Sequence, residues 1–267
     1  MAFIQIDRPH DHVARITMNR PERMNAMAFD VMVPLRQAIE EISVDNDVRV
    51  VVLTGAGEGF SSGADQTDAG IPPNIDGLTP VTIALRALEV LDDVVLALRK
   101  MHQPVIGAIN GPAVGGGFCL SLACDIRIAS DTAYFRAAGI NNGLTASELG
   151  ISYLLPRAIG SSRAFEIMLS GRDVDAAEAD RIGLVSRVVP PDELLDACYE
   201  LAARISAFSR VGVEATKRLL WSSLDAGSLA SHIDHEGHAQ LFVRMTTQNF
   251  EEAIIARREG RPPVFLD

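Results

Sequence analysis

The chain has 267 residues, 48% of them hydrophobic, and is therefore long enough to bury a sizeable core. Lys and Arg number 24 against 35 Asp and Glu, and the net charge of −11 argues against nucleic acid or an anionic membrane as a partner. The three cysteines are odd in number and lack zinc-like spacing, which favours a reducing compartment over a disulfide scaffold. The sequence shows no secretion signal and no apolar run of membrane-spanning length, so we expect a cytoplasmic location.

The first third of the chain predicts a strand, helix, strand order. Alternating apolar and polar residues predict strands at residues 3–6 and 12–18, and helical spacing follows over 28–42. Residues 48–54 are almost all apolar, which is typical of a strand buried on both faces of a parallel sheet. Residues 55–76 are rich in Gly, Pro and Asp and predict a long loop, a length that usually signals function.

The middle of the chain continues the alternation of strands and helices. A helix is predicted over residues 80–101, and strands over 105–109 and 125–129, so the core belongs to the α/β class. From Pro191 onward the pattern is helical, over residues 191–207, 211–226, 228–246 and 248–258. We therefore expect an α/β core at residues 1–190 and a helical region at 191–267 whose apolar stripes are hidden by subunit contact.

The stretch IGAINGPAVGGGFCLSLACD, residues 106–125, combines an apolar strand, a glycine-rich turn and a helix. The three glycines at 115–117 remove every side chain from the start of that helix. Unpaired amides and the helix dipole favour a negative oxygen at such a position. This turn is a candidate site for the enolate oxygen of a thioester.

A second amide-rich loop, Phe60 to Asp65, directly follows the buried strand at 48–54. Two amides from separate loops can form an oxyanion hole, in which each donor lowers a barrier by roughly 3–4 kcal/mol. Either loop alone is weak evidence, because glycine turns often end strands.

Together these loops resemble the crotonase superfamily, also called the enoyl-CoA hydratase/isomerase family. The resemblance runs through nearly the whole chain. Its segments are NRPERMNAM (19–27), VVLTGAGEGFSSGAD (51–65), QPVIGAINGPAVGGG (103–117), LACDIRIAS (122–130), LLPRAIG (154–160) and SGRDVDAAEADRIGLVSRVV (170–189).

The resemblance implies a crotonase-like spiral of ββα units with a C-terminal all-helical oligomerisation region, assembled as a homotrimer or a dimer of trimers. It also implies an acyl-CoA substrate; coenzyme A is then part of the substrate, and neither a separate cofactor nor a metal is expected. By position, the amides of Ala64 and Gly116 would hold the thioester oxygen.

Further residues are implied to contact the coenzyme A portion. Arg23 and the segment from Ala64 through Asp65 to Gln66 correspond to family segments that wrap around the pantetheine and nucleotide. The lysine that often precedes the family's terminal arginine is Gly260 here. Arg258 or Arg261 are the candidates to replace it, and solvated surface arginines are the alternative.

The chain departs from family hydratases at both catalytic glutamates. Cys119 stands where the first is expected and Gly139 where the second is expected, both in the substrate pocket. Without these carboxylates, simple hydration loses its general acid/base pair. Glu148 resembles the aspartate of dienoyl-CoA isomerases, and an apolar pocket would raise its pKa and suit it to carry a proton between carbons. The alternative is a carboxylate that only complements a helix dipole.

Other residues have two interpretations. Cys119 in the first turn of a helix is either a nucleophile or a buried apolar side chain. Asp68 and Tyr153 are candidates to face the acyl pocket, with a solvated loop and a packed ring as the alternatives. His232, His235 and His238 recur every three residues, but one helix cannot point all three at one ion, so no metal site is predicted.

The sequence thus predicts an enzyme that acts on an acyl-CoA thioester by stabilising its enolate, with double-bond isomerisation favoured over hydration and Glu148 as the proton carrier. One alternative is an enoyl-CoA hydratase that recruits Glu148 and a water. The other is an acyl-CoA-binding protein without catalysis.

Overall fold

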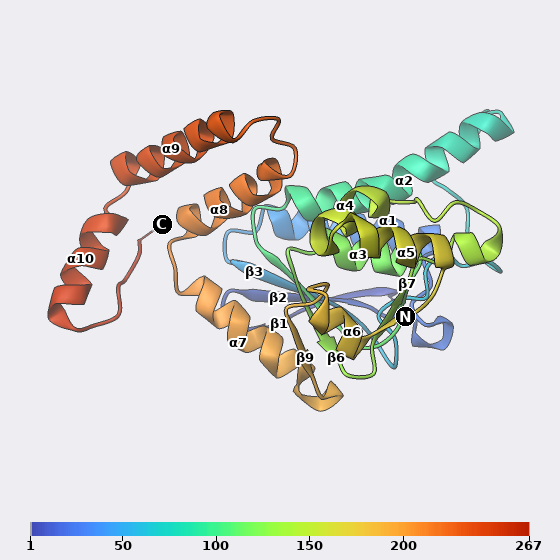
Figure 1. Ribbon diagram of the computed structural model, residues 1–267, viewed down its shortest axis with the longest axis horizontal. Coiled ribbons are helices and arrows are strands. Elements are labelled where there is room, and N and C mark those ends of the chain that lie inside the picture. Colours follow the sequence, from blue (N-terminus) through green and yellow to red (C-terminus); the bar gives the residue numbers. More distant parts are fainter. Residues whose placement is uncertain (1, 267) are drawn as a thin grey trace.

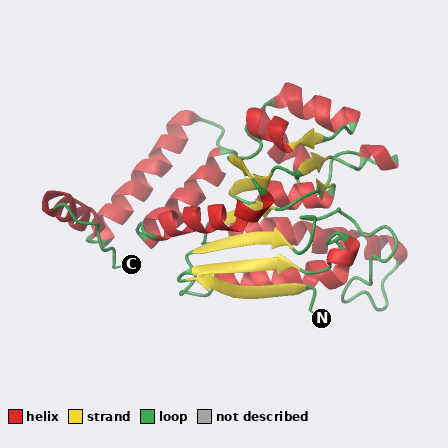
Figure 2. Ribbon diagram, turned by 90° about the horizontal axis from the view of Figure 1, so that it is seen from below, coloured by secondary structure: helices red, strands yellow, loops and turns green. Residues whose placement is uncertain are grey.

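A computed structural model describes residues 2–266, and its main sheet has six strands in the order β1-β2-β3-β4-β6-β9 (Figures 1 and 2). The β1–β2 pair is antiparallel and the other four pairings are parallel. This is the α/β core that the sequence predicts, with β9 as a strand that it did not predict. The strands are β1 Ile4–His10, β2 Val13–Met18, β3 Val50–Gly55, β4 Val105–Ile109, β6 Ile126–Ser130 and β9 Arg187–Val189.

The sheet is covered on both faces, as the apolar run at 48–54 predicts. Along β3, Val51 and Leu53 belong to the cluster that includes residues of α1 (Phe29–Ser43), α2 (Pro80–Lys100) and α3 (Gly116–Ala123). Val50 and Val52 belong to a second cluster, with Leu194, Ala197, Cys198 and Ala202 of α7 (Leu194–Ser206). Alternate residues of one strand thus serve two layers, which is why every residue of β3 is buried.

A small three-stranded sheet, β5-β7-β8, lies beside the glycine-rich turn. Its strands are β5 Ala113–Val114, β7 Tyr134–Arg136 and β8 Val174–Asp175. The helices around it are α4 Ile151–Ile159, α5 Ser161–Ser170 and α6 Ala176–Arg181, and short 3-10 turns lie at Pro21–Arg23, Ile140–Asn142 and Pro191–Glu193. Strands of two or three residues are too short to show a sequence period.

Three further helices follow α7; α9 lies beside α8, and α9 and α10 extend away from the sheet (Figure 1). They are α8 Arg210–Ser223, α9 Leu229–Thr246 and α10 Asn249–Glu259. His232 is the buried residue of α9, whereas Leu229, Phe242 and Met245 are all more than half exposed. The helical tail is therefore present, and α7 before it packs on the sheet; the division at residue 190 stays a prediction. Within residues 2–266, no helix is both long and apolar enough to cross a membrane.

Candidate active site

The two amide-rich loops lie against each other. Ser61 and Ala113 form a parallel bridge, and the amide of Val114 donates to the carbonyl of Ser61 at 2.9 Å. The contact is tight: a Cβ on Gly117 would lie 2.3 Å from the Ser61 carbonyl oxygen, and a Cβ on Gly63 would lie 3.2 Å from the Gly116 nitrogen. Glycine at these positions allows the backbone of one loop to approach the backbone of the other.

The peptide that carries the Ala64 amide is fixed from its opposite side. The carbonyl of Gly63 accepts from the Met27 amide at 2.7 Å, and the amide of Asp65 donates to the Met27 carbonyl at 3.2 Å. In a trans peptide the C=O and N–H point in opposite directions, so the Ala64 N–H is directed away from Met27. Within residues 2–266, the Ala64 amide donates to no protein group.

The Gly116 amide is the first of helix α3, whose eight residues are all buried. The preceding amide, of Gly115, donates to the carbonyl of Arg136 at 2.8 Å, and in the described part of the chain Gly116 itself donates to no protein group. A free amide at the start of a helix attracts a negative oxygen. The structure thus brings two unpaired backbone donors, Ala64 and Gly116, onto adjoining loops.

Glu148 lies next to this turn. Its Oε1 is 3.3 Å from the position that a Cβ on Gly115 would occupy, and its backbone carbonyl accepts from the Ile151 amide that opens α4. Glu148 is an exposed residue, yet partial desolvation of its carboxyl by neighbouring atoms raises the pKa of Glu148 above its ordinary value. A carboxylate with a raised pKa beside an unpaired backbone amide is suited to proton transfer.

Cys119 is completely buried, and its thiol donates to the Glu148 carbonyl at 3.5 Å. Burial, with a smaller effect of the Glu148 charge, raises the pKa of the Cys119 thiol well above its ordinary value. A thiolate nucleophile requires the opposite shift. Cys119 thus behaves as an apolar side chain in the wall beside Glu148.

Gly139 has no space for a side chain. A Cβ there would lie 2.0 Å from the carbonyl oxygen of Thr145, in the loop that leads to Glu148. A glutamate at residue 139 would therefore displace this loop. The backbone between Gly139 and Glu148 thus occupies the space that a side chain at residue 139 would need.

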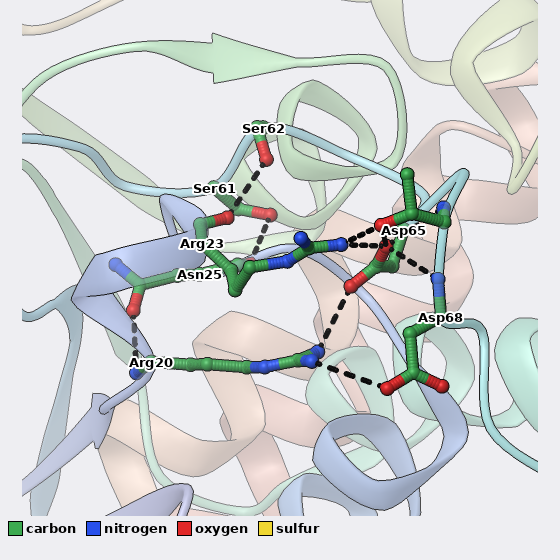
Figure 3. A network of polar contacts seen from close by, with 8 residues as sticks. Arg20, Arg23, Asn25, Ser61, Ser62, Asp65 and Asp68 are labelled. Carbon is green, nitrogen blue, oxygen red and sulfur yellow. Dashed lines mark hydrogen bonds and ion pairs between the residues drawn. The ribbon is translucent and has the colours of Figure 1, made fainter.

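The residues predicted to contact coenzyme A are brought together in part. Arg23 and Asp65 form an ion pair at 2.6 Å, and Gln66 is exposed beside them. The side chain of Asp68 is 73% exposed, with Oδ2 at 3.9 Å from Arg20, which matches the solvated-loop interpretation (Figure 3).

Tyr153 and Arg261 are engaged in other contacts. The Tyr153 hydroxyl donates to Asp225, and the guanidinium of Arg157 stacks on its ring at 3.5 Å, as the packed-ring interpretation predicts. Arg261 pairs with Glu252 at 2.6 Å within its own tail. Arg258 is exposed on α10.

Sequence reasoning did not predict the buried contacts of Arg20 and Asn25. Asn25 is fully buried, and its Nδ2 donates to the carbonyls of Ala56 at 2.9 Å and Gly59 at 2.8 Å. Arg20 donates to Asp65 at 3.1 Å. The only available signal was two polar residues in a segment, 19–27, that resembles a family motif.

A cavity of about 770 Å³ lies elsewhere, between α8 and the starts of β4 and β6. Lys217, Trp221 and Phe265 are among its lining residues, and no residue of the two loops lines it. The Ala64 amide follows the carboxyl end of β3 and the Gly116 amide follows the carboxyl end of β4, whereas the cavity lies at the start of β4. This cavity therefore does not belong to the site.

The chain was compared with known protein families, curated proteins and solved structures. The profile of the family described as "Enoyl-CoA hydratase/isomerase" matches residues 8–267. "Probable enoyl-CoA hydratase EchA12" of Mycobacterium tuberculosis is 67% identical over 267 residues, which are 100% of this chain and 94% of that protein.

Two solved structures are similar as well. A probable enoyl-CoA hydratase/isomerase from Mycobacterium abscessus is 64% identical with a TM-score of 0.96, covering 99% of this chain and 98% of that one. A structure described as a monofunctional enoyl CoA isomerase from M. smegmatis is 61% identical with a TM-score of 0.75, covering 87% of this chain and 99% of that one.

Proposed function

The chain belongs to the enoyl-CoA hydratase/isomerase family, or crotonase superfamily, and we propose that it isomerises the double bond of an enoyl-CoA thioester. The observation that carries the proposal is the arrangement of Glu148 beside the glycine turn, together with a buried thiol at residue 119 and no space for a side chain at residue 139. One carboxylate is present where hydratases of the family use two.

The proposed reaction is a proton shift through an enolate. Glu148 takes a proton from the α carbon of a 3-enoyl thioester. The electrons of that C–H bond form a double bond between the carbonyl and α carbons, and the carbonyl π electrons move onto the thioester oxygen. The amides of Ala64 and Gly116 hold this negative oxygen. The carbonyl then reforms, the carbonyl–α double bond shifts to the α and β carbons, and the former β–γ π electrons take the proton back from Glu148 at the γ carbon. A single acid/base residue suffices because the proton is taken and returned on the same substrate.

The proposed contacts with coenzyme A come from residues that border the same loops. We propose that Arg23 and the backbone from Ala64 to Gln66 bind the coenzyme, because they border the Ala64 amide. The half-exposed guanidinium of Arg23 supplies a positive charge for the coenzyme's phosphates.

Hydration is the second candidate, because relatives that are 67% identical bear the name of a probable hydratase. It requires a second group to activate water. The two reactions are separated by assaying the purified protein with a 3-enoyl-CoA and with crotonyl-CoA. We expect rapid isomerisation that is lost in Glu148→Ala and retained in Glu193→Ala, an exposed glutamate on the other side of the sheet.

Two outcomes would contradict the proposal. Fast hydration of crotonyl-CoA that survives Glu148→Ala would establish a hydratase with a different acid/base group. Thermal stabilisation by coenzyme A without turnover of any thioester would establish a binding protein.

We also propose a homotrimer, or a pair of trimers, in the cytoplasm. The exposed apolar residues of α9 support the assembly, since Leu229, Ile233 and Leu241 recur every four or eight residues on one face. Ile233→Glu would then lower the molar mass measured by light scattering. Three buried, unpaired cysteines support a reducing compartment.

A further inference from the structure

The carboxylate of Asp65 lies directly after the proposed oxyanion donor in the chain. It is buried, with its side chain 1% exposed, and it has contacts with two arginines that both come from the segment 20–23 (Figure 3). Arg20 donates to Oδ2 at 3.1 Å, and Arg23 donates to Oδ1 at 2.6 Å. Asp65 therefore ties the loop of the Ala64 amide to a different part of the chain.

The same carboxylate also holds its own loop. Oδ1 accepts from the amides of Thr67 at 3.0 Å and Asp68 at 2.9 Å, and from the Thr67 hydroxyl at 3.0 Å. These donors lower the pKa of Asp65, the Asp68 amide having the largest effect and the Arg23 guanidinium the next. The group is thus ionised throughout the neutral range.

Backbone bonds hold this loop on both sides of Asp65. Before it, the Ser62 amide donates to the Met24 carbonyl at 2.9 Å, and Met27 holds the Gly63 carbonyl and the Asp65 amide. After it, the next backbone bond to another segment runs from the Phe29 amide to the Ala69 carbonyl at 2.9 Å. Between these bonds, the Asp65 side chain supplies the contacts with Arg20 and Arg23, which restrain the residue that directly follows the Ala64 amide.

We propose that Asp65 is a positioning residue whose buried ion pairs with Arg20 and Arg23 aim the Ala64 amide at the thioester oxygen. The inference rests on the proposed function of the same two loops. It assigns the side chain of Asp65 a role besides any contact of its backbone with coenzyme A.

Asparagine at residue 65 is the appropriate test, because it keeps the shape of the side chain and removes its charge. Its amide nitrogen would face either an arginine or the backbone donors, which leaves one set of donors without an acceptor. We expect Asp65→Asn to lower kcat roughly 10- to 100-fold, the effect of a displacement of about 1 Å in a catalytic geometry, with KM changed less than about threefold.

A second measurement detects polarisation of the bound thioester, which would not change if Asp65 only stabilised the fold. The carbonyl stretching frequency of bound crotonyl-CoA, measured by difference infrared spectroscopy, falls when two amides polarise the thioester. In Asp65→Asn we expect this shift to be partly lost while the coenzyme still binds. The matched control is Asp7→Asn, which breaks an exposed Arg–Asp pair of 2.5 Å between β1 and β2.

Thr67→Val serves if Asp65→Asn does not fold, since it removes one donor to the carboxylate from an exposed residue. It should cause a smaller loss in the same direction. An unchanged carbonyl frequency and unchanged kcat in folded Asp65→Asn would overturn the inference. The infrared readout requires binding and not turnover, so a wild-type protein that polarises the carbonyl without isomerising it contradicts the proposed reaction while still testing Asp65.

Discussion

The Oε1 atom of Glu148 lies 3.3 Å from the point where a Cβ on Gly115 would stand, so the carboxylate rests against the turn that presents the Gly116 amide. Gly115 has a φ of 53°, a conformation that L side chains rarely adopt. One residue thus meets two requirements, a left-handed turn before helix α3 and space for the proposed proton carrier.

Gly115→Ala should therefore impair both stability and catalysis. With φ 53° and ψ −121°, Gly115 lies outside the regions that a residue with a Cβ populates, and such backbone strain costs about 1–3 kcal/mol. The added methyl group also pushes against Oε1 of Glu148, and we expect kcat for isomerisation to fall roughly tenfold or more. Steady-state kinetics and thermal unfolding measure the two effects separately.

Gly183→Ala is the control for this substitution. Gly183 has a φ of 76° and no atom within 4 Å of the position of its Cβ, so it bears the strain without the contact. An equal loss of kcat in both variants would show that strain alone lowers the activity, and the role of the Glu148 contact would be rejected.

The raised pKa of Glu148 predicts how activity depends on pH. The carboxylate must be ionised to take a proton, so kcat should fall as pH drops through a pKa above the ordinary 4.5 of a glutamate. Glu148→Gln should lower kcat by roughly 10²–10⁴-fold and abolish this acid limb. A limb that persists in the residual activity of Glu148→Gln would belong to another group.

The stability of the folded protein should change with pH in the opposite direction to kcat. Partial burial of the Glu148 carboxyl favours its protonated form in the folded protein, so its stabilising contribution is complete below the unfolded-state pKa and is lost as pH rises through the folded-state pKa. At neutral pH the partial desolvation of the Glu148 charge thus costs a small amount of stability. We expect Glu148→Gln to unfold at an equal or higher temperature than the wild type at pH 7, and at the same temperature near pH 4.

Cys119→Ala tests whether the thiol takes part in the chemistry. The thiol is buried with a raised pKa, and it donates to the Glu148 carbonyl. We expect isomerisation within about threefold of the wild type and a loss of about 1 kcal/mol in unfolding free energy from the reduced packing. Complete loss of activity in a folded variant, or a covalent acyl adduct on Cys119 in mass spectra of the wild type, would instead show that Cys119 acts as a nucleophile.

The centre of the α/β core could be predicted from local patterns because β3 and β4 are apolar runs that are followed by Gly55 or Asn110. The run at 48–54 became β3, and the glycines at 115–117 marked the start of α3. Strands β5 and β8 have two residues each and are held by contacts with other segments, so no local pattern announces them.

Parts of the site depend on contacts between distant segments. Arg20 and Asp65 are 45 positions apart, and Tyr153 reaches Asp225 across 72 positions. A polar residue in a loop gives no sign of whether it meets solvent or a buried partner. The two amide-rich loops were recognisable because their chemistry lies in the backbone, which glycine exposes wherever it occurs.

Lys217 is buried in α8, at the junction of the helical tail and the sheet. Its ammonium group lies 2.9 Å from Oδ2 of Asp125 and donates to the carbonyls of Gln103 at 2.8 Å and Leu98 at 3.3 Å. Trp221, one turn further along α8, donates to the other oxygen of Asp125 at 2.5 Å. These contacts attach α8 to the segments that precede β4 and β6.

Lys217→Met should therefore destabilise the protein strongly. Removal of one partner of a buried ion pair costs roughly 3–5 kcal/mol, and because Asp125 keeps the donors of Trp221 and the Val105 amide, we expect the lower end of this range. Burial lowers the pKa of Lys217, the Asp125 charge opposing this, so the lysine already bears a desolvation cost that its three acceptors offset.

Lys100→Met at the exposed end of α2 is the control, with an expected change within about 0.5 kcal/mol. Urea unfolding followed by the fluorescence of Trp221, the single tryptophan, measures both variants at the affected junction. Equal midpoints would mean that α8 is held by its apolar contacts and not by the ion pair.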